Sequence, residues 1–183
     1  MTGLASRGQL RASFVRWALF TVPLVLLLGF LSGQVGSSAQ SAWFQSLTKP
    51  AIFPPPMWFG IVWSILYVLM GLALAMVCAA WGARGRTAAI AAFVVQLLVN
   101  LAWSPVFFGM HQIKTGLLVI GVLDALVVVT IVLFWRVRRV AALLLLPYLA
   151  WIAFATLLNW EFLVANPDGG TDTPNGAVQR YEF

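Results

Sequence analysis

Five long apolar runs dominate the sequence and limit the folds open to it. They occupy residues 14–32, 57–81, 87–109, 115–135 and 140–164. Each is close to the length of about 20 residues that an α-helix needs to cross a bilayer. The hydrocarbon layer offers no water to backbone amides, so a spanning segment must satisfy its own hydrogen bonds as a helix. The sequence therefore predicts an all-α fold, an integral membrane bundle of five transmembrane helices.

The spacing of the runs predicts one membrane domain followed by a tail. Residues 1–165 hold all five runs, and 33–56 is the one long connection. Residues 166–183 are polar and rich in Gly and Pro, which predicts disorder. Composition supports a membrane location, since 62% of the residues are hydrophobic and 9% are charged, too few charges for a soluble surface. The net charge of +6 comes mostly from short loops, so we expect no nucleic-acid partner.

The basic residues predict the orientation in the membrane. One side carries Arg7, Arg11, Arg16, Arg84, Arg86, Arg136, Arg138 and Arg139, and the other carries Lys49, Lys114 and Arg180. Cytoplasmic loops are enriched in Lys and Arg, which places the N-terminus in the cytoplasm and the 33–56 loop and the C-terminus outside. We expect a multi-pass protein of a bacterial cell membrane. An alternative interpretation of the first run, with its arginines, is a signal peptide.

Aromatic and amide side chains share one face on three of the predicted helices. At helical spacing the sequence places Trp63 and Tyr67 on the second helix, Gln96, Asn100, Trp103 and Phe107 on the third, and Tyr148, Trp151, Ala155 and Asn159 on the fifth. An amide in lipid is costly without a partner, so these faces should point inward. Two interpretations stay open: the amides tie helices together, or the faces enclose an aromatic ligand pocket.

Several other features carry expectations of their own. Pro105 and Pro147 should kink their helices. Cys78 should be a buried thiol. Gly71, Ala75 and Ala79, and likewise Ala88 and Ala92, form ridges of small residues that permit close packing within the chain or between chains.

Two titratable residues leave alternatives open. Asp124 is either a functional carboxylate in the membrane or a neutral group hydrogen-bonded to a neighbouring helix. His111 is either a solvated loop residue or an axial haem ligand. It is the only histidine, so we expect no metal site built from several ligands. The sequence carries no catalytic triad, phosphate loop or metalloprotease motif.

Three stretches resemble a known family. "KPAIFPPPMWFGIVWSILYVLMG", "QLLVNLAWSPVFFG" and "LPYLAWIAFATLLNWE" are similar, in this order, to motifs of the translocator protein family, TspO/MBR, also called the tryptophan-rich sensory or peripheral-type benzodiazepine receptor family. The resemblance runs from about Trp43 to Asn166. It implies a five-helix membrane bundle, often a homodimer, that binds porphyrins or haem-like tetrapyrroles and requires no cofactor. In mitochondrial members it also implies binding of cholesterol and drug-like molecules.

The resemblance also implies site residues. The family's pocket positions fall on Trp63, Asn100, Trp103, Trp151, Ala155 and Leu158. The 33–56 loop would then be a lid over the pocket, stiffened by Pro50, Pro54 and Pro55, with Lys49 placed to pair with a porphyrin propionate. Ile52 and Met57 depart from the aromatic residues common in the family. Trp160 and Val164 replace the tyrosine and arginine of its cholesterol motif, which lowers the expectation of sterol binding.

Three functions follow as expectations. The first is a membrane protein that binds porphyrin as a sensor, scavenger or carrier. The second is an enzyme that degrades porphyrin in light or with oxygen, using Trp63 and Trp151 as redox-active aromatics. The third is a transporter of small metabolites, although five helices are few for alternating access and no inverted repeat is visible.

Overall fold

The computed structural model describes residues 7–35 and 41–169 of the chain. Within these ranges it contains α1 (Arg7–Val35), α2 (Ala42–Ser46), α3 (Pro56–Cys78), α4 (Arg86–Ser104), the π-helical turn η1 (Pro105–Gly109), α5 (Ile113–Val137), α6 (Arg139–Leu143) and α7 (Leu146–Ala165). Five segments are long and apolar enough to cross a membrane, namely Gly8–Gln34, Pro56–Cys78, Arg86–Gly109, Ile113–Val137 and Arg139–Ala165. The predicted all-α membrane bundle of five helices is confirmed.

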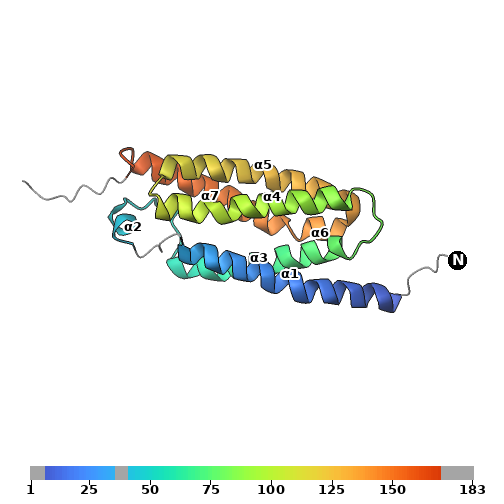
Figure 1. Ribbon diagram of the computed structural model, residues 1–183. Helices are drawn as coiled ribbons and strands as arrows, with labels where there is room; N and C mark the ends of the chain where they lie inside the picture. Colours follow the sequence, from blue (N-terminus) through green and yellow to red (C-terminus); the bar gives the residue numbers. More distant parts are fainter. Residues whose placement is uncertain (1–6, 36–40, 170–183) are drawn as a thin grey trace, which may run out of the picture.

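The helices form two layers that run along a common axis (Figure 1). One layer is the pair α1 and α3, and the other contains α4, α5 and α7, with α5 packed between the other two. The short helix α2 lies at one end of the bundle, beside the end of α7, and the start of α1 lies at the opposite end. The short connections between spanning helices explain this antiparallel arrangement.

Close packing of α1 on α3 depends on the ridge of small residues. A Cβ atom at Gly71 would lie 2.6 Å from the Cα atom of Val22, so the two backbones can approach only because this residue is glycine. The Thr21 hydroxyl donates a hydrogen bond to the Gly71 carbonyl oxygen at 2.8 Å, and Ala75 is fully buried. The Gly71 and Ala75 part of the ridge therefore serves packing within the chain.

Proline explains where the helices start and change. Pro56 is the first residue of α3 and Pro55 is extended, as expected of a rigid entry into a helix. Helix α4 gives way to the wider turn η1 at Pro105. The predicted span 140–164 corresponds to Arg139–Ala165, which is divided into α6 and α7 just before Pro147, where a kink was predicted. Proline lacks an N–H and cannot bond the carbonyl four residues earlier, so the helix breaks rather than bends.

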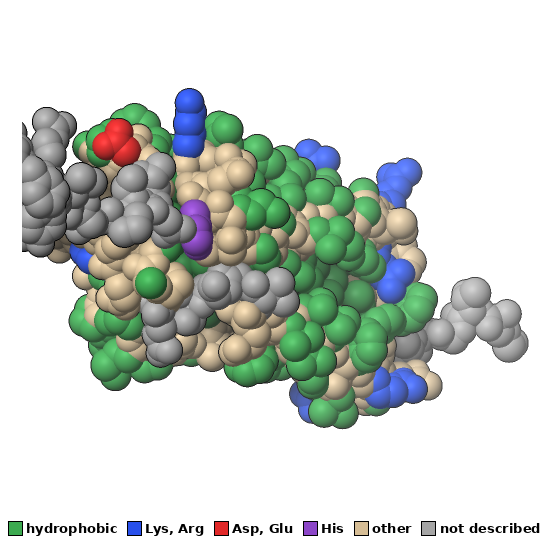
Figure 2. Space-filling view, turned by 60° about the vertical axis from the view of Figure 1, so that its left-hand side comes forward, with side chains coloured by type: hydrophobic (Ala, Val, Ile, Leu, Met, Phe, Trp, Pro, Cys, Tyr) green, Lys and Arg blue, Asp and Glu red, His purple; other side chains and the backbone are tan. Residues whose placement is uncertain are grey.

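The end of the bundle where α1 starts is tightly packed and basic. Phe93 of α4 stacks on Phe134 of α5 at 5.9 Å, and Cys78 is buried there as predicted. Arg86 donates hydrogen bonds to the Cys78 carbonyl oxygen, the shorter at 2.8 Å, and so satisfies the end of α3. Figure 2 shows an apolar belt and, beside it, several Arg side chains at this end.

Candidate functional site

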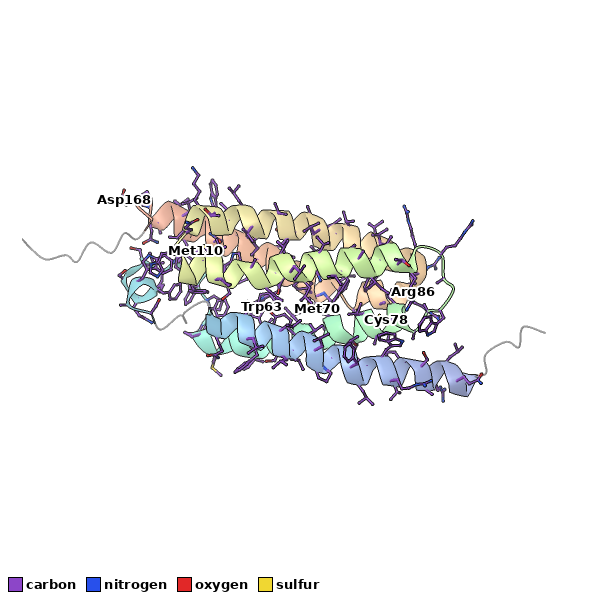
Figure 3. The ribbon with its side chains drawn as sticks, in the orientation of Figure 1. Trp63, Met70, Cys78, Arg86, Met110 and Asp168 are labelled. Atoms are coloured by element: carbon purple, nitrogen blue, oxygen red, sulfur yellow. The ribbon has the colours of Figure 1, made fainter. Side chains whose placement is uncertain are left out.

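A cavity of about 730 Å³ opens between the two layers, in the half of the bundle next to α2. Its walls come from α1, α3, α4, η1, α5 and α7, and Phe44 and Phe53 from the loop between α1 and α3 close over it. Figure 3 shows Trp63 inside the bundle, with Met110 toward the α2 end and Cys78 and Arg86 toward the opposite end. The cavity thus occupies one half of the bundle, and the packed core occupies the other.

The sequence placed eleven residues on the three faces or at the family's pocket positions, and the structure brings nine of them to one cavity. The nine are Trp63, Tyr67, Asn100, Trp103, Phe107, Trp151, Ala155, Leu158 and Asn159, whereas Gln96 lies outside the cavity wall. Tyr148 does not line it. Its side chain is fully buried, lies edge-on to Trp63 with ring centroids 6.2 Å apart and donates a hydrogen bond to Gln96 Oε1 at 3.0 Å. Tyr148 therefore packs against the wall residue Trp63 without lining the cavity itself.

Tyr67 and Trp63 of α3 form a stacked pair that neighbouring helices hold in place. Their rings stack with centroids 5.2 Å apart, and the Tyr67 hydroxyl donates a hydrogen bond to Asn100 Oδ1 at 3.1 Å. On its other side the Tyr67 ring lies against Gly29 of α1, where a Cβ atom would lie only 2.2 Å from the ring. Glycine at this position lets the ring fit between the layers, so the wall depends on α1 as well as α3.

The amide groups both tie helices together and line the cavity. Asn159 Oδ1 accepts a hydrogen bond from Trp103 Nε1 at 3.3 Å, and Asn159 Nδ2 donates to the Ile113 carbonyl oxygen at 2.9 Å. One side chain of α7 thereby joins α4 to the start of α5. The two interpretations of these amides are compatible, because the bonds that join the helices also orient the aromatic wall.

The loop over the cavity contains a short helix that the sequence did not indicate. Helix α2 begins after Ser41, whose side chain accepts a hydrogen bond from the Phe44 N–H at 3.2 Å. Phe44 then packs on Phe108 with centroids 5.2 Å apart and on Phe162 with centroids 5.6 Å apart. Because aromatic pairs of this geometry add to burial, the loop is held on η1 and α7.

The lid residues named from the sequence hold the loop and do not line the cavity. Lys49 Nζ donates hydrogen bonds to the Phe44 carbonyl oxygen and, at 3.1 Å, to that of Leu47, and it lies 4.2 Å from the centroid of the Phe44 ring. Burial lowers the pKa of the Lys49 ammonium from its ordinary value. These carbonyl oxygens are the partners of Lys49 in this structure, and its pairing with a propionate stays a prediction. Pro50, Pro54 and Pro55 are likewise absent from the cavity wall.

Asn166 connects the loop to the end of α7. Its Oδ1 accepts a hydrogen bond from the Thr48 N–H at 2.9 Å, and its Nδ2 donates to the Thr48 carbonyl oxygen at 3.1 Å. The predicted tail begins at residue 166, and at this first residue the structure shows a side chain bonded to both backbone groups of Thr48. Residues 167–169 follow as a turn, in which the Gly169 N–H donates to the Asn166 carbonyl oxygen at 3.0 Å, and the predicted tail from residue 170 onward lies outside the described residues.

Asp124 and His111 lie outside the cavity wall. Asp124 Oδ2 accepts a hydrogen bond from Thr156 Oγ1 at 2.7 Å, which links α5 to α7 as the second interpretation expected, while the charge state of Asp124 stays a prediction. His111 stacks on Trp43 of α2 with centroids 4.4 Å apart and planes inclined by 13°. Since His111 faces the loop helix, its position does not favour axial ligation of a haem inside the cavity.

Sequence reasoning missed two groups of wall residues. One is the set of phenylalanines that close the cavity, Phe44, Phe53, Phe59, Phe108 and Phe162. A signal existed for Phe162, which lies three residues after Asn159 and so extends the face that begins at Tyr148. The other group comes from α1, where Leu26, Leu27 and Phe30 line the cavity. That helix is apolar on every side, so no stripe marked the face toward the cavity.

Comparison with known proteins places this architecture in a family. The TspO/MBR family model matches residues 21–165. The chain is 39% identical over 147 residues to "Tryptophan-rich protein TspO" of Chlorobaculum tepidum, covering 80% of this chain and 93% of that protein. It is 39% identical over 127 residues to "Protein CrtK" of Rhodobacter capsulatus, covering 69% of this chain and 79% of that protein. It is 34% identical over 135 residues to "Translocator protein" of Bos taurus, covering 73% of this chain and 80% of that protein. These matches confirm the resemblance, and the chain belongs to the TspO/MBR family.

Proposed function

We propose that this membrane protein binds porphyrin-type tetrapyrroles, haem included, in the aromatic cavity and acts as a sensor, scavenger or carrier of them. The observation that carries the proposal is the cavity wall itself. Trp63, Trp103 and Trp151, from three different helices, line one space. Its volume of about 730 Å³ falls in the range of roughly 300–1,000 Å³ that is usual for small-molecule sites. Indole faces suit stacking on a flat conjugated ring.

The proposal includes an orientation and an assembly. The protein lies in a bacterial cell membrane with its N-terminus in the cytoplasm. Helix α2 and the cavity end face outward, because the arginine-rich loops share the opposite end.

The active form is a homodimer. Since α1 covers the Gly71 and Ala75 ridge, the small residues left for a second copy are Ala88 and Ala92 of α4. The mass of the complex extracted in native lipid tests the dimer, and a monomeric mass would contradict it.

The test of binding is a titration of the full-length protein in lipid nanodiscs. Protoporphyrin IX, haem and cholesterol are added separately, and porphyrin absorbance and protein fluorescence are recorded against empty nanodiscs. We expect saturable, protein-dependent binding of protoporphyrin or haem, and weaker binding of cholesterol. If neither tetrapyrrole binds in a saturable way, the proposed function is wrong.

Degradation of porphyrin is a second candidate, favoured by two ring contacts of Trp63. The Trp63 ring touches Tyr67 in the wall and Tyr148 behind it, so oxidisable rings run from the cavity into the core. Illumination of the saturated complex in the presence of dioxygen separates the two functions. A binding protein leaves the porphyrin spectrum intact, whereas an enzyme bleaches it, and more slowly after Trp63→Phe even at saturation. Flux into liposomes tests the transporter alternative.

A further inference from the structure

The cavity wall carries no charge. Among the described residues, none that lines the cavity is Lys, Arg, His, Asp or Glu. In the described part of the chain, the Lys, His, Asp and Glu side chains at the same end of the bundle, namely Lys49, His111, Lys114, Glu161 and Asp168, lie outside the wall, and so does Asp124 in α5. Lys49, the cation best placed by sequence to meet an anionic ligand, instead donates to the Phe44 and Leu47 carbonyl oxygens.

The polar groups of the wall are largely occupied by the protein itself. Ser32 Oγ donates to the Leu101 carbonyl oxygen at 2.6 Å, and Ser64 Oγ donates to the Gly60 carbonyl oxygen at 2.7 Å. Asn159 is bonded at both its oxygen and its nitrogen. The remaining uncharged polar side chains, such as Gln34 and Ser104, cannot neutralise an anion. A carboxylate inside this cavity would lose its water and find no compensating cation.

We infer that the cavity selects the uncharged form of its ligand: a flat apolar ring system whose acidic groups are esterified or protonated. The inference rests on the proposed function and narrows its ligand class. Porphyrins with ionised propionates are the less favoured form, and they bind only to the extent that their carboxylates stay outside the wall. Neutral esters bind without that restriction, because the described wall offers ring contacts and a few uncharged donors, such as the unpartnered Trp151 Nε1–H, but no cation.

Two probes that differ only in charge test this preference. Protoporphyrin IX and its dimethyl ester are each titrated into wild-type protein in zwitterionic nanodiscs from pH 4 to pH 8. Affinities are expressed relative to porphyrin already dissolved in the lipid, measured with empty nanodiscs, so that partitioning from water cancels. The free carboxyl groups ionise near a reference pKa of about 4–5, within this range.

The two probes should respond differently to pH. We expect the affinity of the free acid to fall at least about tenfold as its carboxyl groups ionise, because each must then be excluded from the wall. The affinity of the ester should change less than about threefold, and this series controls for any effect of pH on the protein. A free acid that binds as tightly at pH 8 as at pH 4, or more tightly than the ester at pH 8, would overturn the inference while leaving the proposed function standing. Failure of both probes to bind would instead refute the proposed function.

A substitution in the cavity wall tests the preference for an uncharged ligand by changing the protein instead of the ligand. Ser104 ends α4, is half-buried and lines the cavity, so Ser104→Lys places a cation in the wall. At pH 8 we expect this variant to raise the ratio of acid affinity to ester affinity at least about tenfold. Thr48→Lys, at an exposed position outside the wall, is the matched control and should leave the ratio unchanged. An unchanged ratio in a folded Ser104→Lys protein contradicts the inference. If that variant does not fold, the pH series on the wild type decides.

Discussion

Replacing Gly29 of α1 with alanine should displace the Tyr67 ring, which forms part of the cavity wall. The added Cβ atom would lie 2.2–2.7 Å from three carbon atoms of the Tyr67 ring, far inside contact distance. A ring at the end of a side chain can sometimes move aside, but this one is stacked on Trp63 at 5.2 Å and bonded to Asn100 at 3.1 Å. Relief of the clash therefore breaks at least one of these contacts or separates α1 from α3.

The magnitude follows from these contacts. Overpacking of a tight interior typically costs about 1–3 kcal/mol, and loss of the Tyr67–Asn100 hydrogen bond adds roughly 0.5–1.5 kcal/mol. We expect Gly29→Ala to lower the free energy of unfolding by about 2–4 kcal/mol and to weaken tetrapyrrole binding. Gly121→Ala is the matched control, because its Cβ atom would meet nothing within 4 Å and alanine is favoured in a helix by up to about 1 kcal/mol.

Reversible unfolding in mixed micelles of lipid and denaturing detergent measures the difference. A double-mutant cycle assigns it to the ring, since the cost of Gly29→Ala should shrink when Tyr67 is already leucine. If Gly29→Ala is as stable as Gly121→Ala, or if its cost is the same with and without the Tyr67 ring, the packing described for this wall is wrong.

Three further predictions test the cavity, the membrane orientation and the loop. Ala155→Phe should fill ligand space and weaken porphyrin binding while the bundle stays folded, and unchanged affinity in a folded variant would remove Ala155 from the site. A topology reporter fused after Phe183 should be active outside the cytoplasm and one inserted between Gly82 and Arg86 should be active inside it, and the reverse pattern would overturn the orientation. Asn166→Ala removes two hydrogen bonds to Thr48, each worth roughly 0.5–1.5 kcal/mol, so hydrogen exchange in residues 42–53 should accelerate. Equal exchange rates in wild type and variant would show that Asn166 does not hold the loop.

The fold was readable from the sequence because lipid imposes a strong constraint. Run length alone distinguishes membrane-spanning helices, and amide groups such as Asn100 and Asn159 had to point inward. The sequence located the irregularity at Pro147, but local sequence cannot show whether the helix there bends or is interrupted for two residues, as it is between α6 and α7. A small-residue ridge likewise does not reveal its partner, which for Gly71 is Val22 of the same chain.

The wall of the site was only partly readable. Helical spacing groups residues on a face, but it does not measure depth, so Tyr148 was placed in the cavity although it lies behind Trp63. Lys49 was assigned to a ligand because a basic residue near the surface has many possible partners. Its partners in this structure are carbonyl oxygens of its own loop, which become available only when α2 forms. The contribution of α1 had no sequence signal, because lipid-facing and cavity-facing leucines are chemically alike.

The most direct measurement of the central claim compares three tryptophan variants by porphyrin absorbance titration in nanodiscs. Trp63 and Trp151 line the cavity, whereas Trp81 is exposed at the opposite end and contacts Trp17 and Arg86. Each Trp→Phe change in the cavity keeps a ring but loses stacking area, so Trp63→Phe and Trp151→Phe should each weaken protoporphyrin binding by roughly 0.5–1.5 kcal/mol, and Trp81→Phe should not change it. Equal weakening by all three variants would contradict the account, because the tryptophans would then act only as membrane anchors.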